Sequence, residues 1–282
     1  MITLQEEYFL TRRAYVPEHL PGYGRAFSGG GEPFLLEGYL GYLQEKTLVW
    51  VGYPLEGTFQ EEKMKSALEA AIKKCRPSRV AITAPYFSGA EGEKESADFY
   101  YRLELTSLRV PSKIKNMVHR AGRELAIDTG SEFGEDHQTL IDLFLESREV
   151  EEGTRLIFGR IAAYLSSVPT ARVFAARNSG GKLAGFDVAD FGAAEYAFYL
   201  FNFRSQKAAV PGISDLLLHT LIQEAQERGK KYLNLGLGIN KGVAFFKEKW
   251  GARPFLPHQS LVYRLSPPSF FDLLLKGLTK VC

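Results

Sequence analysis

Cysteine is scarce in this chain: only Cys75 and Cys282 occur among its 282 residues. Two cysteines cannot build a disulfide framework or a zinc site of their own, so the sequence predicts a reduced, cytoplasmic setting. The chain has no large excess of charge of one sign either, because it contains 35 Lys and Arg and 33 Asp and Glu. This balance argues against a stable binder of DNA, although it is compatible with a local basic patch.

Long apolar runs and the common catalytic motifs are also missing. No stretch of about 20 apolar residues occurs, so no membrane-spanning helix is predicted. The N-terminus MITLQEEYFL has acidic residues where a secretory signal has basic ones. The motifs G-x-S-x-G, Walker A and H-E-x-x-H do not occur. The five scattered histidines have no metal-ligand spacing, so we expect no metal site.

What the sequence does contain is a mixed pattern of strands and helices. In the first 108 residues, alternation and turn signals predict strands over Leu35–Gln44, Thr47–Pro54, Arg79–Ala84 and Asp98–Leu105. Apolar residues at helical spacing predict a helix over Gln60–Cys75. The stretch Ser88–Ser96, rich in glycine and charge, predicts a loop.

The second part repeats this mixed pattern. A helix is expected to begin at Pro111 and to bury a face that extends to Leu125. Further helices are predicted over Glu135–Val150, Thr154–Ser167, Gly212–Arg228 and Lys241–Trp250. Strands are predicted over Ala171–Arg177, Lys182–Phe191, Glu195–Phe203, Tyr232–Leu237 and Arg253–Leu265. The fold class is therefore α/β with a mixed sheet, and an amphipathic helix over 267–282 is expected to dock on the body or to make a weak membrane-surface contact.

The most informative stretch is YLNLGLGINKGVAFFKEKWGARP, from Tyr232 to Pro254. A strand enters a Gly-rich turn and then a helix that carries Lys247 between Phe246 and Trp250. This spacing places a cation at the carboxyl edge of the sheet, where open α/β sheets bind ligands. The ammonium there could hold a phosphate or stabilise an oxyanion, or Lys247 could simply be a surface residue beside a core helix.

Two other stretches suggest anion binding. The Pro-Gly turn before the helix at Gly212 leaves free N–H groups at a helix start. The stretch RVPSKIKNMVHRAGR, from Arg109 to Arg123, is basic and holds no acidic residue. Its basic face is either an ordinary solvated surface or a contact for the phosphates of a nucleotide, a coenzyme or an RNA end.

Three segments together resemble the GNAT superfamily of acyltransferases, and within it the Fem-like branch of bacterial peptidoglycan-bridge aminoacyltransferases. They are KIKNMVHRAGRELAI, YLFNFRSQKAAVPGISDLLLHTLIQEA and KKYLNLGLGINKGVAFFKEKWGA, whose F-K-x-x-W-G is the most specific part. The resemblance covers about Val110 to Leu265 and implies two tandem GNAT-like domains, 1–108 and 109–266. The coenzyme A loop of the family, R/Q-x-x-G-x-G/A, is degenerate here, because Ala209 stands where Arg or Gln belongs when Gly212 is the first glycine.

The resemblance implies transfer of an acyl or aminoacyl group from acyl-CoA or aminoacyl-tRNA to an amine acceptor such as a cell-envelope precursor, without a tightly bound cofactor. Lys247 is expected to steady the donor or the oxyanion, Tyr199 to act as an acid or hydrogen-bond donor, and Asp190 to bind the amine. The donor is expected to contact Arg204, Lys207, Gly212, Ile213 and Ser214. The substrate, including a transfer-RNA acceptor end, is expected to contact Arg109, Lys115, Arg120, Arg123 and Asn234.

Three alternatives stay open at this point. The chain could be a non-catalytic GNAT-like binding protein or an ordinary acetyl-CoA-dependent N-acetyltransferase. The segment GLGINKGVAFFKEKW also resembles the C-terminal domain of lysyl-phosphatidylglycerol synthases, which implies a lipid acceptor as the third alternative.

Overall fold

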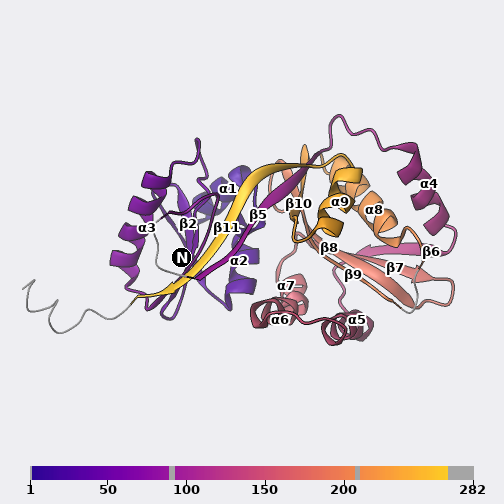
Figure 1. The fold of residues 1–282 in the computed structure, drawn as a ribbon, viewed down its shortest axis with the longest axis horizontal. Coiled ribbons are helices and arrows are strands. Elements are labelled where there is room, and N and C mark those ends of the chain that lie inside the picture. Colours follow the sequence, from indigo (N-terminus) through magenta and orange to yellow (C-terminus); the bar gives the residue numbers. More distant parts are fainter. Residues whose placement is uncertain (1, 89–92, 207–209, 266–282) are drawn as a thin grey trace, which may run out of the picture. The chain divides into compact units, whose positions relative to one another are not determined.

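The computed structural model describes residues 2–88, 93–206 and 210–265, which form two compact units. Of the described residues, the first unit contains 31–88, 93–97 and 258–265, and the second contains 2–30, 98–206 and 210–257. The strands β5 (Glu93–Glu104) and β11 (Arg253–Arg264) each change from one unit to the other along their length (Figure 1). The bounds 1–108 and 109–266 stay a prediction for the two GNAT-like domains, because the N-terminal residues 2–30 group with the later part of the chain.

The first unit is a sheet covered by one helix. Its strands follow the order β1 (Glu32–Leu36), β2 (Tyr39–Gln44), β3 (Thr47–Val51), β4 (Arg79–Ala84) and β11. The helix α3 (Glu61–Cys75) connects the parallel strands β3 and β4, and its buried side packs on Leu48 and Trp50. The single strand predicted over Leu35–Gln44 is wrong, because Glu37 and Gly38 take positive φ and turn the chain between β1 and β2.

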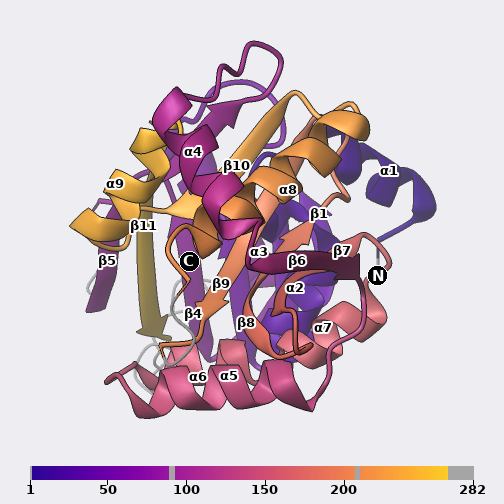
Figure 2. The same cartoon turned by 90° about the vertical axis from the view of Figure 1, so that its right-hand side faces the viewer.

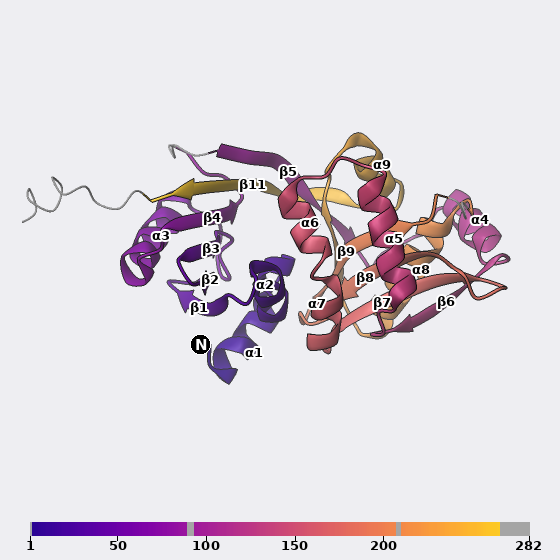
Figure 3. The ribbon, with the colours of Figure 1, turned by 90° about the horizontal axis from the view of Figure 1, so that it is seen from below.

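The second unit is a sheet with helices on both faces. The strand order is β5, β10 (Tyr232–Leu237), β9 (Tyr196–Arg204), β8 (Leu183–Asp190), β7 (Ala171–Asn178) and β6 (Leu125–Gly130). Helices α4 (Ser112–Ala121) and α8 (Ile213–Glu227) cover one face, and α5 (Glu135–Glu146), α6 (Glu152–Phe158) and α7 (Ile161–Ser167) cover the other (Figures 2 and 3).

Two predicted helices in this unit differ from the observed ones. The helix that begins after Pro111 ends at Ala121, and Leu125 instead opens β6, where it is still buried. The helix predicted over Thr154–Ser167 is divided into α6 and α7 at Gly159 and Arg160. Both differences lie at glycines, which are weak helix formers and favour chain breaks.

The N-terminal residues form helices that the sequence pattern does not predict. They are α1 (Leu4–Arg13), the 3₁₀ turn η1 (Pro17–His19) and α2 (Pro21–Ser28). Backbone and side-chain contacts join this segment to the sheet of the second unit: Ala194 N donates to Thr11 O at 2.8 Å, and Asn234 Nδ2 donates to Tyr15 O at 2.8 Å. The segment therefore lies against β10 and the turn that precedes β9.

Candidate acyl-transfer site

The parallel strands β9 and β10 separate in the middle of the sheet. They pair over three positions only, which end at Asn234 and Phe198, and no further pair joins them within the described residues. Beyond that point β10 bulges, with Gly236 at φ 73°, while β9 continues to Arg204. Backbone groups that have no neighbouring strand can bind an extended ligand, so this divergence is the natural centre of a site.

Lys247 lies at this divergence, at the carboxyl end of β10. Helix α9 (Lys241–Lys249) buries its side chain to 3% exposure, and the ammonium donates a hydrogen bond to the carbonyl oxygen of Leu237. A Cβ added at Gly236 would lie 3.9 Å from Nζ of Lys247 and 3.6 Å from the carbonyl oxygen of Tyr199. The ammonium is therefore close to the backbone of both diverging strands, and its expected contact with a donor or an oxyanion stays a prediction.

Burial sets the charge state of this lysine. Desolvation lowers the pKa of Lys247 to about 7, and the nearby carboxylate of Asp98 opposes that shift. The ring of Tyr101 lies 5.7 Å from Nζ and offers a cation–π contact. The side chain is therefore an ammonium mainly below about pH 7. In that form it is largely withdrawn from water, so it interacts more strongly with developing negative charge than a solvated cation does.

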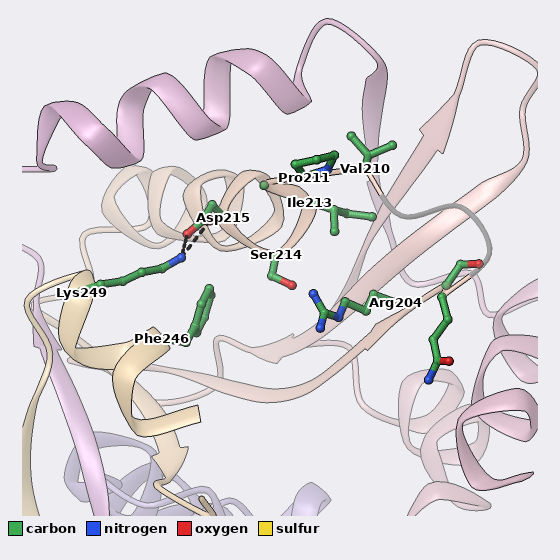
Figure 4. A pocket seen from close by; sticks show the side chains of 11 residues that line it. Arg204, Val210, Pro211, Ile213, Ser214, Asp215, Phe246 and Lys249 are labelled. Carbon is green, nitrogen blue, oxygen red and sulfur yellow. Dashed lines mark hydrogen bonds and ion pairs between the residues drawn. The ribbon is translucent and has the colours of Figure 1, made fainter. Parts of the chain in front are cut away.

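A cavity of about 440 Å³ opens at the start of α8 (Figure 4). Its lining comes from the end of β9, the α8 start and α9, and consists of Arg204, Ser205, Gln206, residues 210–215, Phe246 and Lys249. The side chains of Arg204, Ser214 and Phe246 point toward the same space in Figure 4. The predicted donor residues Arg204, Gly212, Ile213 and Ser214 are thus brought together, whereas Lys207 lies outside the described residues.

The turn into α8 requires glycine. Gly212 has φ 88°, and a Cβ at this position would lie 2.7 Å from the carbonyl oxygen of Met117 on α4. The tight turn exposes the first N–H groups of the helix, and those of Ser214 and Asp215 donate to no described residue. Such free N–H groups at a helix N-terminus favour an anion in the cavity.

Charge in the cavity is partly neutralised by an ion pair that the sequence analysis did not identify. Asp215 is buried and accepts from Trp250 Nε1 at 2.9 Å, and its carboxylate lies 2.6 Å from the ammonium of Lys249. Arg204 is exposed at the cavity rim. The spacing of Asp215 from Gly212 would place a carboxylate in the first turn of α8, but nothing in the sequence pairs it with α9.

Tyr199 belongs to a buried polar group on the α8 side of the sheet. Its hydroxyl lies near the carboxylate of Asp187 on β8, and Asn202 Nδ2 donates to Asp187 Oδ1 at 2.5 Å, while Asp187 Oδ2 has no hydrogen-bond partner within the described residues. Burial raises the pKa of Asp187 to about 8. Burial, together with the neighbouring Asp187 carboxylate, raises the pKa of Tyr199 well above its usual value. The hydroxyl therefore stays protonated at neutral pH, and the expected role of Tyr199 as an acid or hydrogen-bond donor stays a prediction.

Asp190 and Asn234 have internal partners. Asp190 is fully buried, and its oxygens accept from the hydroxyl of Tyr164 and from Gly192 N. Asn234 is buried as well, and besides its bond to Tyr15 its Oδ1 accepts from Gly236 N at 2.8 Å. These contacts give both side chains a structural role, and their predicted contacts with an amine or a substrate remain untested.

The basic residues near α4 are displayed on the surface. Arg109, Lys115, Arg120 and Arg123 are all exposed, whereas Ile114 and Ala121 are buried against the core. Helix α4 packs on α8, and its Met117 carbonyl touches the Gly212 turn that lines the cavity. The basic face is therefore carried by an element that directly adjoins the cavity.

A carboxylate in the N-terminal segment carries no signal in the sequence. Glu18 on η1 is partly exposed, and both of its oxygens accept from the hydroxyl of Tyr100 at 3.0 Å. Burial raises the pKa of Glu18 to about 7. Only the position of η1 beside β5 and β10 distinguishes Glu18 from the chain's other carboxylates, and no local pattern predicts that position.

The described ranges hold neither a cluster suited to a metal ion nor a helix suited to a membrane. No cluster of three or more His, Cys, Asp or Glu side chains suited to a metal ion occurs among residues 2–88, 93–206 and 210–265. In the same part of the chain, no helix is long and apolar enough to cross a membrane. The helix predicted over 267–282 lies outside the described residues.

An antiparallel sheet with one parallel, diverging central pair, and a helix that starts at that pair, defines the GNAT fold. Solved structures with it include FemX, with a TM-score of 0.63 and 12% identity over 99% of this chain and 98% of that one. The C-terminal DUF2156 domain assigned to a lysylphosphatidylglycerol synthetase of Agrobacterium fabrum has a TM-score of 0.61 and 17% sequence identity. The match covers 98% of this chain and 96% of that one. A tandem GNAT protein from the clavulanic acid biosynthesis pathway has a TM-score of 0.50 and 12% sequence identity. The match covers 81% of this chain and 79% of that one.

These likenesses confirm the predicted mixed α/β fold of Fem-like, tandem GNAT type. At 12–17% identity they establish the fold. No family model and no curated protein matches the sequence.

Proposed function

We propose that this protein is an acyltransferase that moves an acyl or aminoacyl group from an activated carrier to an amine. The observation that carries the proposal is the buried ammonium of Lys247 at the point where β9 and β10 separate. A carbonyl bound between these strands would lie beside a poorly solvated cation, which stabilises the tetrahedral oxyanion of acyl transfer. Tyr199 would donate a hydrogen bond or a proton on the same side.

The donor would be a phosphate-rich carrier. The cavity at the α8 start supplies free N–H groups and Arg204, and the exposed cations lie on or near α4, which packs on α8. An aminoacylated RNA end would use both surfaces, whereas a coenzyme would need chiefly the cavity. Two features favour the RNA end: Ala209 replaces the Arg or Gln of the coenzyme A loop, and Asp215 neutralises Lys249.

Ordinary acetyl transfer from acetyl-CoA is the second candidate, because the cavity lies at the helix start where a pyrophosphate binds well. The acceptor is an amine of a cell-envelope precursor, with lipid acceptors as the alternative that the synthetase-like structure suggests. A cytoplasmic setting of a bacterial cell fits both donors.

A transfer assay with two donors tests the proposal. The purified protein is mixed with an RNA minihelix carrying a labelled aminoacyl group, or with labelled acetyl-CoA. The acceptor panel holds a primary amine, a lysine-containing peptidoglycan precursor and phosphatidylglycerol vesicles. We expect label to move from the minihelix to an amine. Tight donor binding without transfer to any acceptor would instead favour the non-catalytic binding protein.

A further inference from the structure

The cavity at the start of α8 contains two cations and one carboxylate. Arg204 reaches it from the end of β9 and Lys249 from α9, while Asp215 is the only acidic side chain among the described residues that line it. The free N–H groups of Ser214 and Asp215 add a partial positive charge, which amounts to about half a unit at a helix N-terminus. The cavity therefore attracts anions, and Asp215 limits that attraction.

Asp215 is held in place by two donors. Its carboxylate accepts from Trp250 Nε1 at 2.9 Å, and the ammonium of Lys249 lies 2.6 Å from Oδ1 and 2.9 Å from Oδ2. Asp215 is 4% exposed and Trp250 is 1% exposed, so the carboxylate cannot turn out to solvent. Figure 4 shows Asp215 and Lys249 beside the side chain of Phe246, whose ring centroid lies 4.7 Å from the ammonium. The ion pair is therefore a fixed part of the cavity wall.

The ion pair sets the net charge that a ligand meets. Asp215 and Lys249 together carry no net charge, which leaves Arg204 as the one full positive charge among the described lining residues, beside the partial charge of the helix start. A phosphodiester carries one negative charge and matches this cavity. A diphosphate diester carries two, and its second phosphate would meet a lysine that is already neutralised and a carboxylate that repels it.

A purely structural role for Asp215 makes a different prediction. A carboxylate in the first turn of a helix interacts favourably with the helix dipole, and the bond to Trp250 joins the end of α9 to α8. Both effects stabilise the protein whether or not Lys249 is present. Lys249, however, has only 29% of its side chain exposed, although a lysine gains solvation when its ammonium extends into water. The two roles therefore separate when the charge of the pair is changed and the Trp250 bond is kept.

We propose that Asp215, together with Lys249, determines the specificity of this cavity: it admits a carrier with isolated phosphodiester groups and excludes a diphosphate carrier. The inference rests on the acyl-transfer function proposed above, and it names the class of carrier for that site. The carrier is the phosphodiester end of a nucleic acid rather than a coenzyme diphosphate. The pair acts on the binding of the carrier and does not touch the reacting carbonyl, which the proposed function places beside Lys247.

The test measures binding of coenzyme A, as the diphosphate probe, and of an RNA minihelix by calorimetric titration of the full-length protein at fixed salt. Three variants change the charge of the pair in steps: Asp215→Asn raises it by one unit, Lys249→Gln lowers it by one unit, and the double variant restores zero. Asp215→Asn keeps a side-chain oxygen that can accept from Trp250. We expect coenzyme A to bind Asp215→Asn at least about 10-fold more tightly than the wild type and Lys249→Gln at least about 3-fold more weakly, with the double variant between them.

Minihelix binding and a control variant separate the local effect from that of overall charge. The minihelix should gain less than coenzyme A from Asp215→Asn, so the preference of the protein for the minihelix should fall. Glu227→Gln removes an exposed carboxylate at the far end of α8, which changes the net charge of the protein by the same amount. This control should leave both affinities within about 2-fold of the wild type.

The outcomes distinguish this proposal from the one on which it rests. A folded Asp215→Asn that binds coenzyme A no more tightly than the wild type overturns the role of Asp215 and leaves the acyltransferase function intact. If Asp215→Asn fails to fold, Lys249→Gln decides, because unchanged or tighter binding of both probes by this variant overturns the proposal. Absence of transfer by the wild type from either donor contradicts the proposed function itself, whereas the order of the coenzyme A affinities still tests Asp215.

Discussion

Replacing Lys247 by Met tests the buried ammonium through stability alone. The side chain is 3% exposed, and burial lowers its pKa from 10.5 to about 7. Between pH 7 and 10.5 the unfolded chain therefore binds a proton that the folded protein does not. Stability rises with pH wherever the unfolded state binds more protons, by up to about 1.4 kcal/mol per pH unit. The wild type should thus gain about 2 kcal/mol relative to Lys247→Met between pH 7 and pH 9.

Urea unfolding of both proteins at pH 6, 7, 8 and 9 measures this difference. Below pH 7 the lysine is protonated in both states, so the difference should be flat there. Subtraction of the two proteins removes the contributions of other groups that titrate in this range, such as Glu18 and Asp187. A difference that stays flat up to pH 9 would show that the ammonium is solvated, and the reasoning about its oxyanion role would be refuted.

Further predictions concern the polar core, the basic face and the α8 turn. Asp187→Asn should be more stable than the wild type at pH 8 and lose that advantage toward pH 4. The wild type loses stability as pH rises from about 4 to about 8, because in this range the folded carboxyl keeps a proton that the unfolded one has released; urea unfolding at both pH values measures it. Arg120→Glu should weaken minihelix binding and reduce its salt slope by about 1, whereas Lys73→Glu, an exposed change on α3, should do neither; binding titrations at several salt concentrations decide. Gly212→Ala should destabilise the protein by more than about 1 kcal/mol in thermal unfolding, because its φ is positive and the new Cβ would meet the Met117 carbonyl; an unchanged melting temperature would contradict this.

The sequence predicts the second unit well where side-chain periodicity is strong. Five elements lie within a few residues of their predicted ranges: the strands β7, β8, β9 and β10 and the long helix α8. Their apolar faces are continuous because they form one core around Leu217 and Leu221. Helix α9 also follows the prediction, and Lys247 is buried at the strand end that its spacing indicated.

The sequence is least informative where tertiary contacts decide the structure. The helices α1 and α2 are short, and η1 between them is rich in proline and glycine neighbours, so local propensity does not specify them. The polar partners are equally hidden, because Asn234 meets Tyr15 across 219 residues and Tyr100 meets Glu18 across 82. Sequence spacing can place a side chain on a face, but it cannot name a partner that only folding brings close.

The most direct test of the central claim is single-turnover transfer by Lys247→Ala and Lys247→Arg, beside Lys241→Ala as an exposed control on the same helix. The site predicts that Lys247→Ala binds the minihelix normally and transfers its aminoacyl group about 10²–10³-fold more slowly, since an oxyanion donor is lost. Lys247→Arg should recover only part of the rate, because a planar guanidinium does not replace a compact ammonium. Wild-type rates in a folded Lys247→Ala protein would contradict the claim that this buried lysine stabilises the reacting carbonyl.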